Sequence, residues 1–512
     1  MSPLTTKLGI IDIGSNSIRL VIYETNSQGA YRVVCEHKDS ARLSERMGPD
    51  LILHSKDILS ILPILNHYTR LCKVHEVTTI RTVATAAVRN AANTADIVRV
   101  LEEQTGLRIE VLSGYEEARY GYLGVMNAID IQDAMIIDIG GGSTEVSLVK
   151  DRQLLHSHSF PFGAVNTTRQ YMQGANLTDQ QMSTIRAMVQ DALSAHPWIA
   201  DSSGLPMIGL GGTIRTLGKM SRKGNKYPIQ LAHNYVMKPS ELRHFLTLLS
   251  SMPLEKRKKI DGLAKERADI IVPGLLILET IFTAAKASSC IISGSGLRDG
   301  LFFETINPKQ PIKSDVLEAS LQNILALHPN AARMHVQHVD AFALQLFDTI
   351  AVSKELDTRC RTYLHTAALL HRIGVSVHYY QYLKHTQYMM QETHIDGLSH
   401  REIVIASLIA TYKTKSRTAQ QVIPYKDLLL ESDTALIVKL GTLLSVARAL
   451  DISETQPVKE IRLHFKESTL MLHMICEYDP QLELRELSTV TKDFEKTWDL
   501  KLTTPSNVFS MM

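Results

Sequence analysis

The chain has 512 residues, 44% of them hydrophobic and 21% charged, with a formal net charge of +2. This length favours three or four domains, the composition is that of a globular protein, and the near-neutral charge excludes a global polyanion-binding signature. The five cysteines are scattered and form no CxxC pair, which argues against a disulfide framework and a cysteine zinc site. We expect a cytoplasmic protein with no integral membrane segment and no specific nucleic-acid partner.

The first predicted element is a strand that ends in a polar turn. Residues 8–20 read LGIIDIGSNSIRL, and their apolar run closes at Asp12. The turn carries Ser15, Asn16 and Ser17, and a strand-like alternation resumes after it. The pattern predicts a strand, a tight turn and a second strand.

A strand over residues 77–83 is followed by a helical pattern over 84–93, with Arg89 near the start of the helix. Arg89 is interpreted in two ways, as a solvated helix residue or as a phosphate clamp. The second interpretation rests on the paired donors of a guanidinium, which match phosphate oxygens.

Two adjacent acids, Glu116 and Glu117, follow a short strand over residues 109–112 and open the next helix. The dipole at a helix N-terminus stabilises negative charge there. A carboxylate so placed could orient or deprotonate water, as a phosphohydrolase requires. The spacing alone does not decide which of the two faces a cleft.

A second copy of the strand–turn–strand pattern organises the rest of the chain. Residues 135–149 read MIIDIGGGSTEVSLV, and Asp138 again closes an apolar run. Gly140, Gly141 and Gly142, followed by Ser143, allow backbone N–H groups to gather around an anion. One such turn could be plain turn chemistry, but two copies indicate two similar half-domains that face one another across a phosphate site.

Further strand–glycine–helix units follow. Residues 207–210 predict a strand that runs into Gly211, Gly212 and Thr213 at a helix N-terminus, which is either an anion site or a connection that needs small residues. A strand over residues 290–293 and a helix over 297–304 repeat the unit, so the architecture is α/β.

The character of the sequence changes after the linker at residues 307–311. Residues 314–450 are helical in period, and residues 459–477 alternate as a β-hairpin around Glu467 and Ser468. The predicted domains are an α/β half-domain at 1–124, a second at 125–306, an all-α domain at 312–452 and a small α+β domain at 456–512.

The paired turns and their acids indicate Mg²⁺-dependent phosphoryl-transfer chemistry. Mg²⁺ prefers one or two carboxylates together with water and phosphate oxygens. Asp138 and Glu145 are candidate ligands of the metal or of its water, and Asp12 could act from the opposite wall. Each of the three could instead be an ordinary structural carboxylate.

Seven ordered motifs resemble the exopolyphosphatase and guanosine pentaphosphate phosphatase family. The motifs are IIDIGSNSIRL, VATAAVRNAAN, SGYEEARYGYLGV, IIDIGGGSTEVSLV, GLGGTIRTL, RADIIVPGLLILE and SGSGLRDGLFFE. The resemblance is dense over residues 8–304 and matches the four-domain branch of the family. It implies two ribonuclease-H-like half-domains of the superfamily of actin, sugar kinases and heat-shock chaperone ATPases.

The resemblance also implies roles for particular residues. Glu117 matches the family's catalytic base, and Asp138 and Glu145 match acids associated with Mg²⁺. Asn16, Arg89, Gly140–Ser143 and Gly211–Thr213 match phosphate-binding positions. The implied reaction is Mg²⁺-dependent, processive hydrolysis of the terminal phosphate of linear polyphosphate by water held on Glu117.

In this family the helical domain resembles the HD phosphohydrolases. Here arginine stands where the metal-binding aspartates would be, at Arg372 after His371 and at Arg448. We predict no metal hydrolysis there, and we interpret His335 and His338 as two histidines on one helix face. A polyphosphate track is expected in this domain, lengthened by a homodimer, with candidate cations Arg372, Lys384, Lys413, Lys415, Arg417 and the KRKK run at 256–259.

Other functions remain open on the sequence alone. A guanosine pentaphosphate 5′-phosphatase would need the same cradle and base, together with a purine pocket that we cannot assign. An ATP-dependent phosphotransferase and a nucleotide-regulated binding protein fit the SG-x-EEA context and the set of acids less well.

Overall fold

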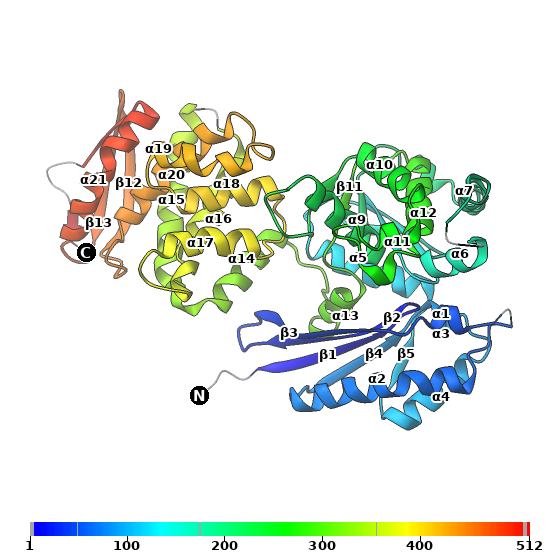
Figure 1. Cartoon of the computed structure of the whole chain (residues 1–512). Helices are drawn as coiled ribbons and strands as arrows, with labels where there is room; N and C mark the ends of the chain where they lie inside the picture. The colour runs from blue at the N-terminus through cyan, green and yellow to red at the C-terminus, as the bar shows by residue number, and fades with distance from the viewer. Residues whose placement is uncertain are drawn as a thin grey trace. The chain divides into compact units, whose positions relative to one another are not determined.

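The computed structural model describes residues 5–48, 50–172, 174, 176–354, 356–504 and 509–511. It divides into two compact units, Met1–Val316 and Leu317–Met512 (Figure 1). The first is α/β and the second is mainly helical, and each is described by itself. The finer division of the chain into four domains stays a prediction.

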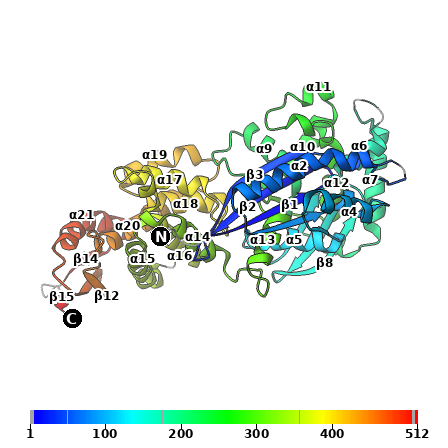
Figure 2. The same cartoon turned by 90° about the horizontal axis from the view of Figure 1, so that it is seen from below.

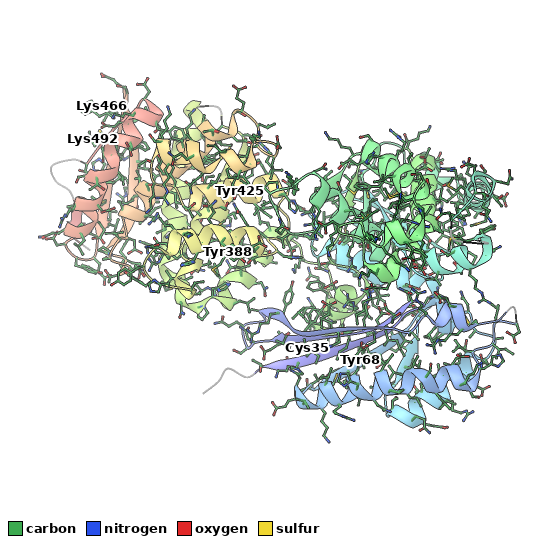
Figure 3. The ribbon with its side chains drawn as sticks, in the orientation of Figure 1. Cys35, Tyr68, Tyr388, Tyr425, Lys466 and Lys492 are labelled. Carbon is green, nitrogen blue, oxygen red and sulfur yellow. The ribbon has the colours of Figure 1, made fainter. Side chains whose placement is uncertain are left out.

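The first sheet of the α/β unit has the strand order β3-β2-β1-β4-β5. Strands β1 and β2 and strands β2 and β3 pair antiparallel, whereas β4 and β5 continue parallel to β1. Apolar side chains of α2 and α4 cover one face of the sheet (Figure 1). The Tyr68 hydroxyl of α2 donates to Asp39 Oδ2 at 2.7 Å (Figure 3). The elements are β1 (Thr6–Ile13), β2 (Ser17–Thr25), β3 (Tyr31–Ser40), α1 (Leu43–Arg46), α2 (Ser55–Val74), β4 (Thr79–Ala84), α3 (Ala86–Arg89), α4 (Thr94–Thr105) and β5 (Ile109–Val111).

The second sheet repeats this arrangement. Its order is β10-β11-β9-β6-β7-β8, so the strands β8-β7-β6-β9-β11 take the places of β3-β2-β1-β4-β5, with β10 added at the edge. Its strands and helices are β6 (Ala134–Ile139), β7 (Thr144–Lys150), β8 (Gln153–Phe160), α6 (Ala164–Tyr171), α7 (Asp179–Ser194), α8 (Trp198–Asp201), β9 (Met207–Leu210), α9 (Gly211–Gly224), β10 (Val236–Met237), α10 (Pro239–Ser250), α11 (Leu254–Arg257), η1 (Lys265–Arg267), α12 (Ile271–Ala284) and β11 (Cys290–Ile292).

Two helices, α5 (Gly114–Met126) and α13 (Leu297–Ile306), join the sheets. One apolar cluster contains Ile10 of β1, Leu123 of α5, Ile136 of β6 and Phe302 of α13. The helices approach closely, because a Cβ added at Gly124 would lie 2.2 Å from the Gly296 carbonyl oxygen. The predicted domain boundary at 124/125 therefore falls inside α5.

The segment around Arg89 differs from its prediction. Residues 84–93 do not form one helix, because α3 ends at Arg89 and α4 starts separately at Thr94. The Thr94 hydroxyl donates to the Val88 and Ala91 carbonyl oxygens and holds the break. Arg89 thus lies at the end of a short helix rather than near the start of a long one.

The second unit packs helices against a small sheet. The predicted hairpin is confirmed as β12 and β13, and β14 and β15 pair parallel to β13. Helices α20 and α21 lie side by side (Figure 2), and the Trp498 indole N–H donates to Thr442 Oγ1 at 3.0 Å. The elements are α14 (Val316–Leu327), η2 (Pro329–Ala331), α15 (Arg333–Lys354), α16 (Thr358–Leu370), η3 (Ile373–Ser376), α17 (Tyr382–Glu392), α18 (His400–Ala410), α19 (Lys415–Gln421), η4 (Ile423–Tyr425), α20 (Asp433–Ala449), β12 (Val458–Lys466), β13 (Thr469–Cys476), α21 (Gln481–Trp498), β14 (Lys501–Thr503) and β15 (Phe509–Met511).

Candidate active site

The two predicted turns meet in the α/β unit. Each is closed by the same hydrogen bond, from Gly14 N to Ser17 O at 3.2 Å and from Gly140 N to Ser143 O at 3.0 Å. The turns touch so closely that a Cβ added at Gly141 would lie 3.0 Å from Ser15 Cβ. Glycine is required here because of this close approach.

A cleft opens where the turns meet. Most of the predicted site residues line it, whereas Arg89, Gly142, Glu145 and Thr213 do not. The predicted residues that line the cleft are Asp12, Ser15, Asn16, Ser17, Glu117, Asp138, Gly140, Gly141, Ser143, Gly211 and Gly212. The structure therefore brings together residues from both copies of the hairpin and from the starts of α5 and α9.

The N-terminus of α5 decides between the two adjacent glutamates. Glu116 is exposed, and its Oε2 accepts a hydrogen bond from Ser113 N at 2.8 Å, which completes a capping box with the Ser113 side chain. Glu117, one position later, lines the cleft. Glu116 caps the helix, so Glu117 is the residue of the pair that can act in the cleft.

Glu117 is held by Arg89, whose Nη1 donates to Glu117 Oε2 at 2.7 Å and also to the Leu112 carbonyl oxygen. Burial raises the pKa of Glu117 to about 7, with Asp138 and Asp12 adding to the rise and Arg89 opposing it. A carboxyl with this pKa is suited to accept a proton near neutral pH. Arg89 orients this group from outside the cleft.

Three further carboxyls interact with Glu117 or with one another: Asp12 and Asp138 are partly exposed at the cleft, and Glu145 is buried. Burial raises the pKa of Asp12 and of Asp138, although Arg19 lies near both. Glu145 is 3% exposed, and its Oε1 accepts a hydrogen bond from the Ser159 hydroxyl at 2.7 Å. Burial, together with Glu117 and Asp138, raises the pKa of Glu145 well above its usual value. The ionised forms of Glu117, Asp138 and Glu145 are thus disfavoured by the neighbouring acids as well as by burial.

This donor set fits a divalent cation that also binds phosphate oxygens. Among the described residues, no group of three or more His, Cys, Asp or Glu side chains is placed to hold a metal ion by itself. Burial nevertheless raises the pKa values of Asp138, Glu145 and Asp12, and a nearby cation would lower them. One or two carboxylates, with water and substrate oxygens, are what Mg²⁺ prefers.

Four arginines that the sequence analysis left without a role line the same cleft, namely Arg19, Arg215, Arg267 and Arg298. Burial and neighbouring arginines lower the pKa of Arg19 to about 10 and also lower the pKa values of Arg215 and Arg267. Such a cluster is unfavourable unless an anion neutralises it. Each arginine lies inside one of the quoted motifs, and that is the signal that could have identified them.

Two buried polar atoms at the cleft have no hydrogen-bond partner among the residues that the structure describes. They are Arg215 Nε and Asn16 Oδ1. Buried polar groups are normally satisfied, so each exception calls for an explanation. A bound anion at the Arg215 guanidinium would supply the missing acceptor.

The glycine pair at the start of α9 makes room for these side chains. Gly211 has φ +80°, and a Cβ there would lie 2.4 Å from Asp138 Oδ1. A Cβ at Gly212 would lie 1.9 Å from Arg267 Nη2. Thr213 is 1% exposed and does not line the cleft, so its phosphate-binding role stays a prediction.

The residues singled out in the helical unit are engaged in its own packing. His335 Nδ1 lies 2.8 Å from Asp451 Oδ2, and His338 Nε2 lies 2.6 Å from the Val458 carbonyl oxygen. Arg372 is 8% exposed and paired with Glu454, and Arg448 Nη2 donates to the Tyr382 hydroxyl at 2.8 Å. These contacts account for both histidines and both arginines.

Two cations proposed for the substrate track are buried. Arg372 is paired as above, and Arg257 of the KRKK run is 2% exposed and donates to the Ala268 carbonyl oxygen. Neither is available on a surface, because each satisfies an internal acceptor. The exposed candidates are Lys256, Lys259, Lys384, Lys413, Lys415 and Arg417.

The two sheets share one strand order, and acids and arginines line the cleft between their turns. This combination defines an enzyme that acts on phosphoryl groups. A model described as the Ppx/GppA phosphatase family matches residues 21–308, and a model of domain III of that family matches residues 318–492. The chain belongs to the Ppx/GppA phosphatase family, and it is a hydrolase that acts on phosphoanhydride bonds.

Solved structures resemble part of the chain. A Ppx/GppA family member from Aquifex aeolicus is 25% identical, with a TM-score of 0.52, and the match covers 60% of this chain and 100% of that one. An exopolyphosphatase from Cytophaga hutchinsonii is 19% identical, with a TM-score of 0.56 and the same coverage, and this likeness concerns the fold alone. Among the described residues, no helix is long and apolar enough to span a membrane.

Proposed function

We propose that the protein is an exopolyphosphatase that hydrolyses the terminal phosphate of linear polyphosphate with a water molecule activated by Glu117. The observation that carries this proposal is Glu117 itself, a largely desolvated carboxyl whose pKa is raised to about 7 and which lines a cleft walled by arginines. The role follows from position as well as acidity, because the adjacent Glu116 is occupied in capping the helix.

Each wall of the cleft has its own task in this mechanism. The turn that carries Ser15, Asn16 and Ser17 and the turn from Gly140 to Ser143 present donors to the terminal phosphoryl oxygens, and Arg19 and Arg215 neutralise its charge. Glu117 takes a proton from water as the water oxygen bonds to phosphorus and the bond to the chain's bridging oxygen breaks. Arg89 keeps the Glu117 carboxylate aimed at the water.

Asp138, Glu145 and Asp12 would hold Mg²⁺. The ion would supply charge neutralisation for the phosphate oxygens, in addition to that from the arginines. Their raised pKa values support this assignment, because the desolvated carboxylates are costly to ionise together even with arginines near Asp12 and Asp138.

The lining of the cleft favours an inorganic polyanion over a nucleotide. Among the described residues that line it, none is aromatic, so no ring is available on which a purine could stack. Guanosine pentaphosphate hydrolysis in the stringent response is the alternative, and the arginines would serve it equally.

The wider family properties are part of the same proposal. The matching order of the two sheets supports ribonuclease-H-like half-domains of the actin and sugar-kinase superfamily. We also propose a degenerate HD-like helical domain, a homodimer, and a cytoplasmic location, which is supported by the five free cysteines.

The test is phosphate release from long polyphosphate, guanosine pentaphosphate and ATP, measured side by side with and without Mg²⁺. Glu117→Gln should abolish turnover, whereas Glu116→Gln, its matched neighbour, should retain it because glutamine also caps a helix. Wild-type turnover by Glu117→Gln, or preference for guanosine pentaphosphate, would overturn the respective part of the proposal.

A further inference from the structure

A second cavity adjoins the catalytic cleft, and the mechanism above does not use it. Its walls include Arg89, Asn90, Tyr115, Ser143, Ser157 and Ser159, and we call it the rear chamber. Its volume is about 320 Å³. Because a water molecule occupies about 30 Å³ in the liquid, a chamber of this size can take a phosphate ion together with several waters.

The rear chamber and the catalytic cleft meet at two places. Ser143 lines both cavities. Glu117 lines the cleft and Arg89 lines the chamber, and their side chains are joined by the 2.7 Å ion pair. The ion pair therefore forms a partition between the two spaces, with the proposed base on one side and a guanidinium on the other.

The chemistry of the rear chamber suits an anion. Among the described residues that line it, there is an arginine but no aspartate or glutamate. The chamber also contacts Gly114 and Tyr115, in the first turn of the 13-residue helix α5, where free N–H groups and the helix dipole favour negative charge. Ser157 adds a hydroxyl group that has no hydrogen-bond partner among the described residues, whereas the Ser159 hydroxyl donates to Glu145.

The polar wall of the chamber lies where a sheet would normally bury apolar groups. On adjacent strands, Glu145 pairs with Ser159 and Ser147 pairs with Ser157, and all four side chains share one face of the sheet. The Ser157 hydroxyl is buried without a hydrogen-bond partner among the described residues. A buried polar face with an unsatisfied hydroxyl is costly unless a ligand uses it.

We propose that the rear chamber binds the orthophosphate product and releases it while the polymer stays in the front cleft. This inference rests on the proposed function. Water attacks phosphorus roughly in line with the departing chain, so the new orthophosphate forms on the side of Glu117, away from the polymer. An exit on that side frees the product without requiring the shortened chain to leave first.

The first test is direct binding. Equilibrium dialysis of the full chain against ³²P-labelled orthophosphate is done in EDTA, with and without excess long polyphosphate to fill the front cleft. One phosphate per chain should remain bound when polyphosphate is saturating. Complete displacement by polyphosphate, or no phosphate binding at all, would overturn the proposal.

The second test places a charge in the chamber. Asn90 is exposed at the chamber wall, so Asn90→Asp should fold normally and weaken phosphate binding by roughly three- to tenfold through like-charge repulsion. Asn307→Asp makes the same change at an exposed position outside the chamber and should leave binding unchanged. Equal effects of the two variants would count against the chamber.

The third test is the pattern of product inhibition. Orthophosphate in the chamber should inhibit polyphosphate hydrolysis noncompetitively, because both ligands bind at once, and Ser157→Leu, which fills the chamber, should slow turnover of long chains. A purely competitive pattern would refute a separate exit. If the protein hydrolyses no polyphosphate, the proposed function fails, whereas the dialysis still decides whether the chamber binds phosphate.

Discussion

The two strand–turn–strand hairpins of the α/β unit have the same backbone arrangement, but they differ in the residue that lies on the neighbouring strand opposite the aspartate of the repeated IIDIG pattern. In the first, Arg19 pairs with Asp12 across the strands, and in the second Glu145 occupies the same place opposite Asp138. The first hairpin thus brings a cation to the cleft and the second adds an acid behind it. The difference teaches that one strand position can carry a cation in one hairpin and an acid in the other, so that matching backbones give the two walls of the cleft different charges.

Within this pair of matching positions, the larger effect is expected from replacing the acid, Glu145. Glu145→Gln should lower kcat by about 10²- to 10³-fold, because a metal ligand supplies several kcal/mol of transition-state stabilisation. Titration of activity with Mg²⁺ would check this. Ser159→Ala, which removes only a hydrogen bond to Glu145, is the milder control, and a Glu145→Gln enzyme with normal Mg²⁺ dependence would contradict the assignment.

Replacing Arg19, the basic residue at the matching position, should affect substrate binding more than catalysis. Arg19→Gln should raise KM about 10- to 100-fold, with a smaller change in kcat, because a charge-assisted hydrogen bond contributes about 1.5–3 kcal/mol. Steady-state kinetics with tripolyphosphate would separate the two constants. If Arg19→Gln and Glu145→Gln had the same kinetic signature, the division of labour between the walls would be wrong.

The raised pKa of Glu117 also predicts how the rate depends on pH. Glu117 must be ionised to accept a proton, and its pKa is raised to about 7, so kcat/KM should rise about tenfold per pH unit below neutrality and level off above it. Arg89→Lys keeps the charge but loses the planar guanidinium that reaches both Glu117 and the Leu112 carbonyl oxygen, so the weakened ion pair should move the inflection to higher pH. A rate that is flat from pH 5 to pH 8 would exclude Glu117 as the base.

The smallest expected effect concerns the helical unit. Lys413→Glu with Lys415→Glu should weaken binding of long chains about two- to fivefold and leave tripolyphosphate turnover unchanged, because exposed charges act weakly and are screened by salt. Lys56→Glu with Lys73→Glu, at exposed positions on α2, is the control. Equal losses for short and long substrates would argue against a track.

The sequence predicted what depends on local pattern. Both strand–turn–strand units, the strand at Met207–Leu210 and the terminal hairpin follow from apolar runs and turn residues, and the structure contains all of them. The side of α5 on which Glu117 lies also has a local cause, the capping box of Ser113 and Glu116. A closer reading of the Ser113–Glu116 spacing could have identified the outward glutamate.

What depends on distant parts of the chain was not predictable. The four arginines come from separate elements, and although each lies inside a quoted motif, the spacing of those motifs does not show that the side chains meet in one cleft; they are Arg19, Arg215, Arg267 and Arg298. The reverse error has the same origin, because Arg257 and Arg372 have the sequence context of surface cations and are buried by acceptors supplied from elsewhere in the fold. The sequence shows where an arginine stands but not which distant acceptor will pair with it.

The core shared by α5 and α13 has a mechanical consequence. Any opening of the two halves that keeps this core packed must rotate them about the helix pair, since the close approach at Gly124 leaves no room for sliding. Such a rotation would part the two turns while Glu117, on α5 itself, stays near the axis. The grip on the substrate would loosen while the base kept its place, so the shortened chain could advance by one unit between cycles.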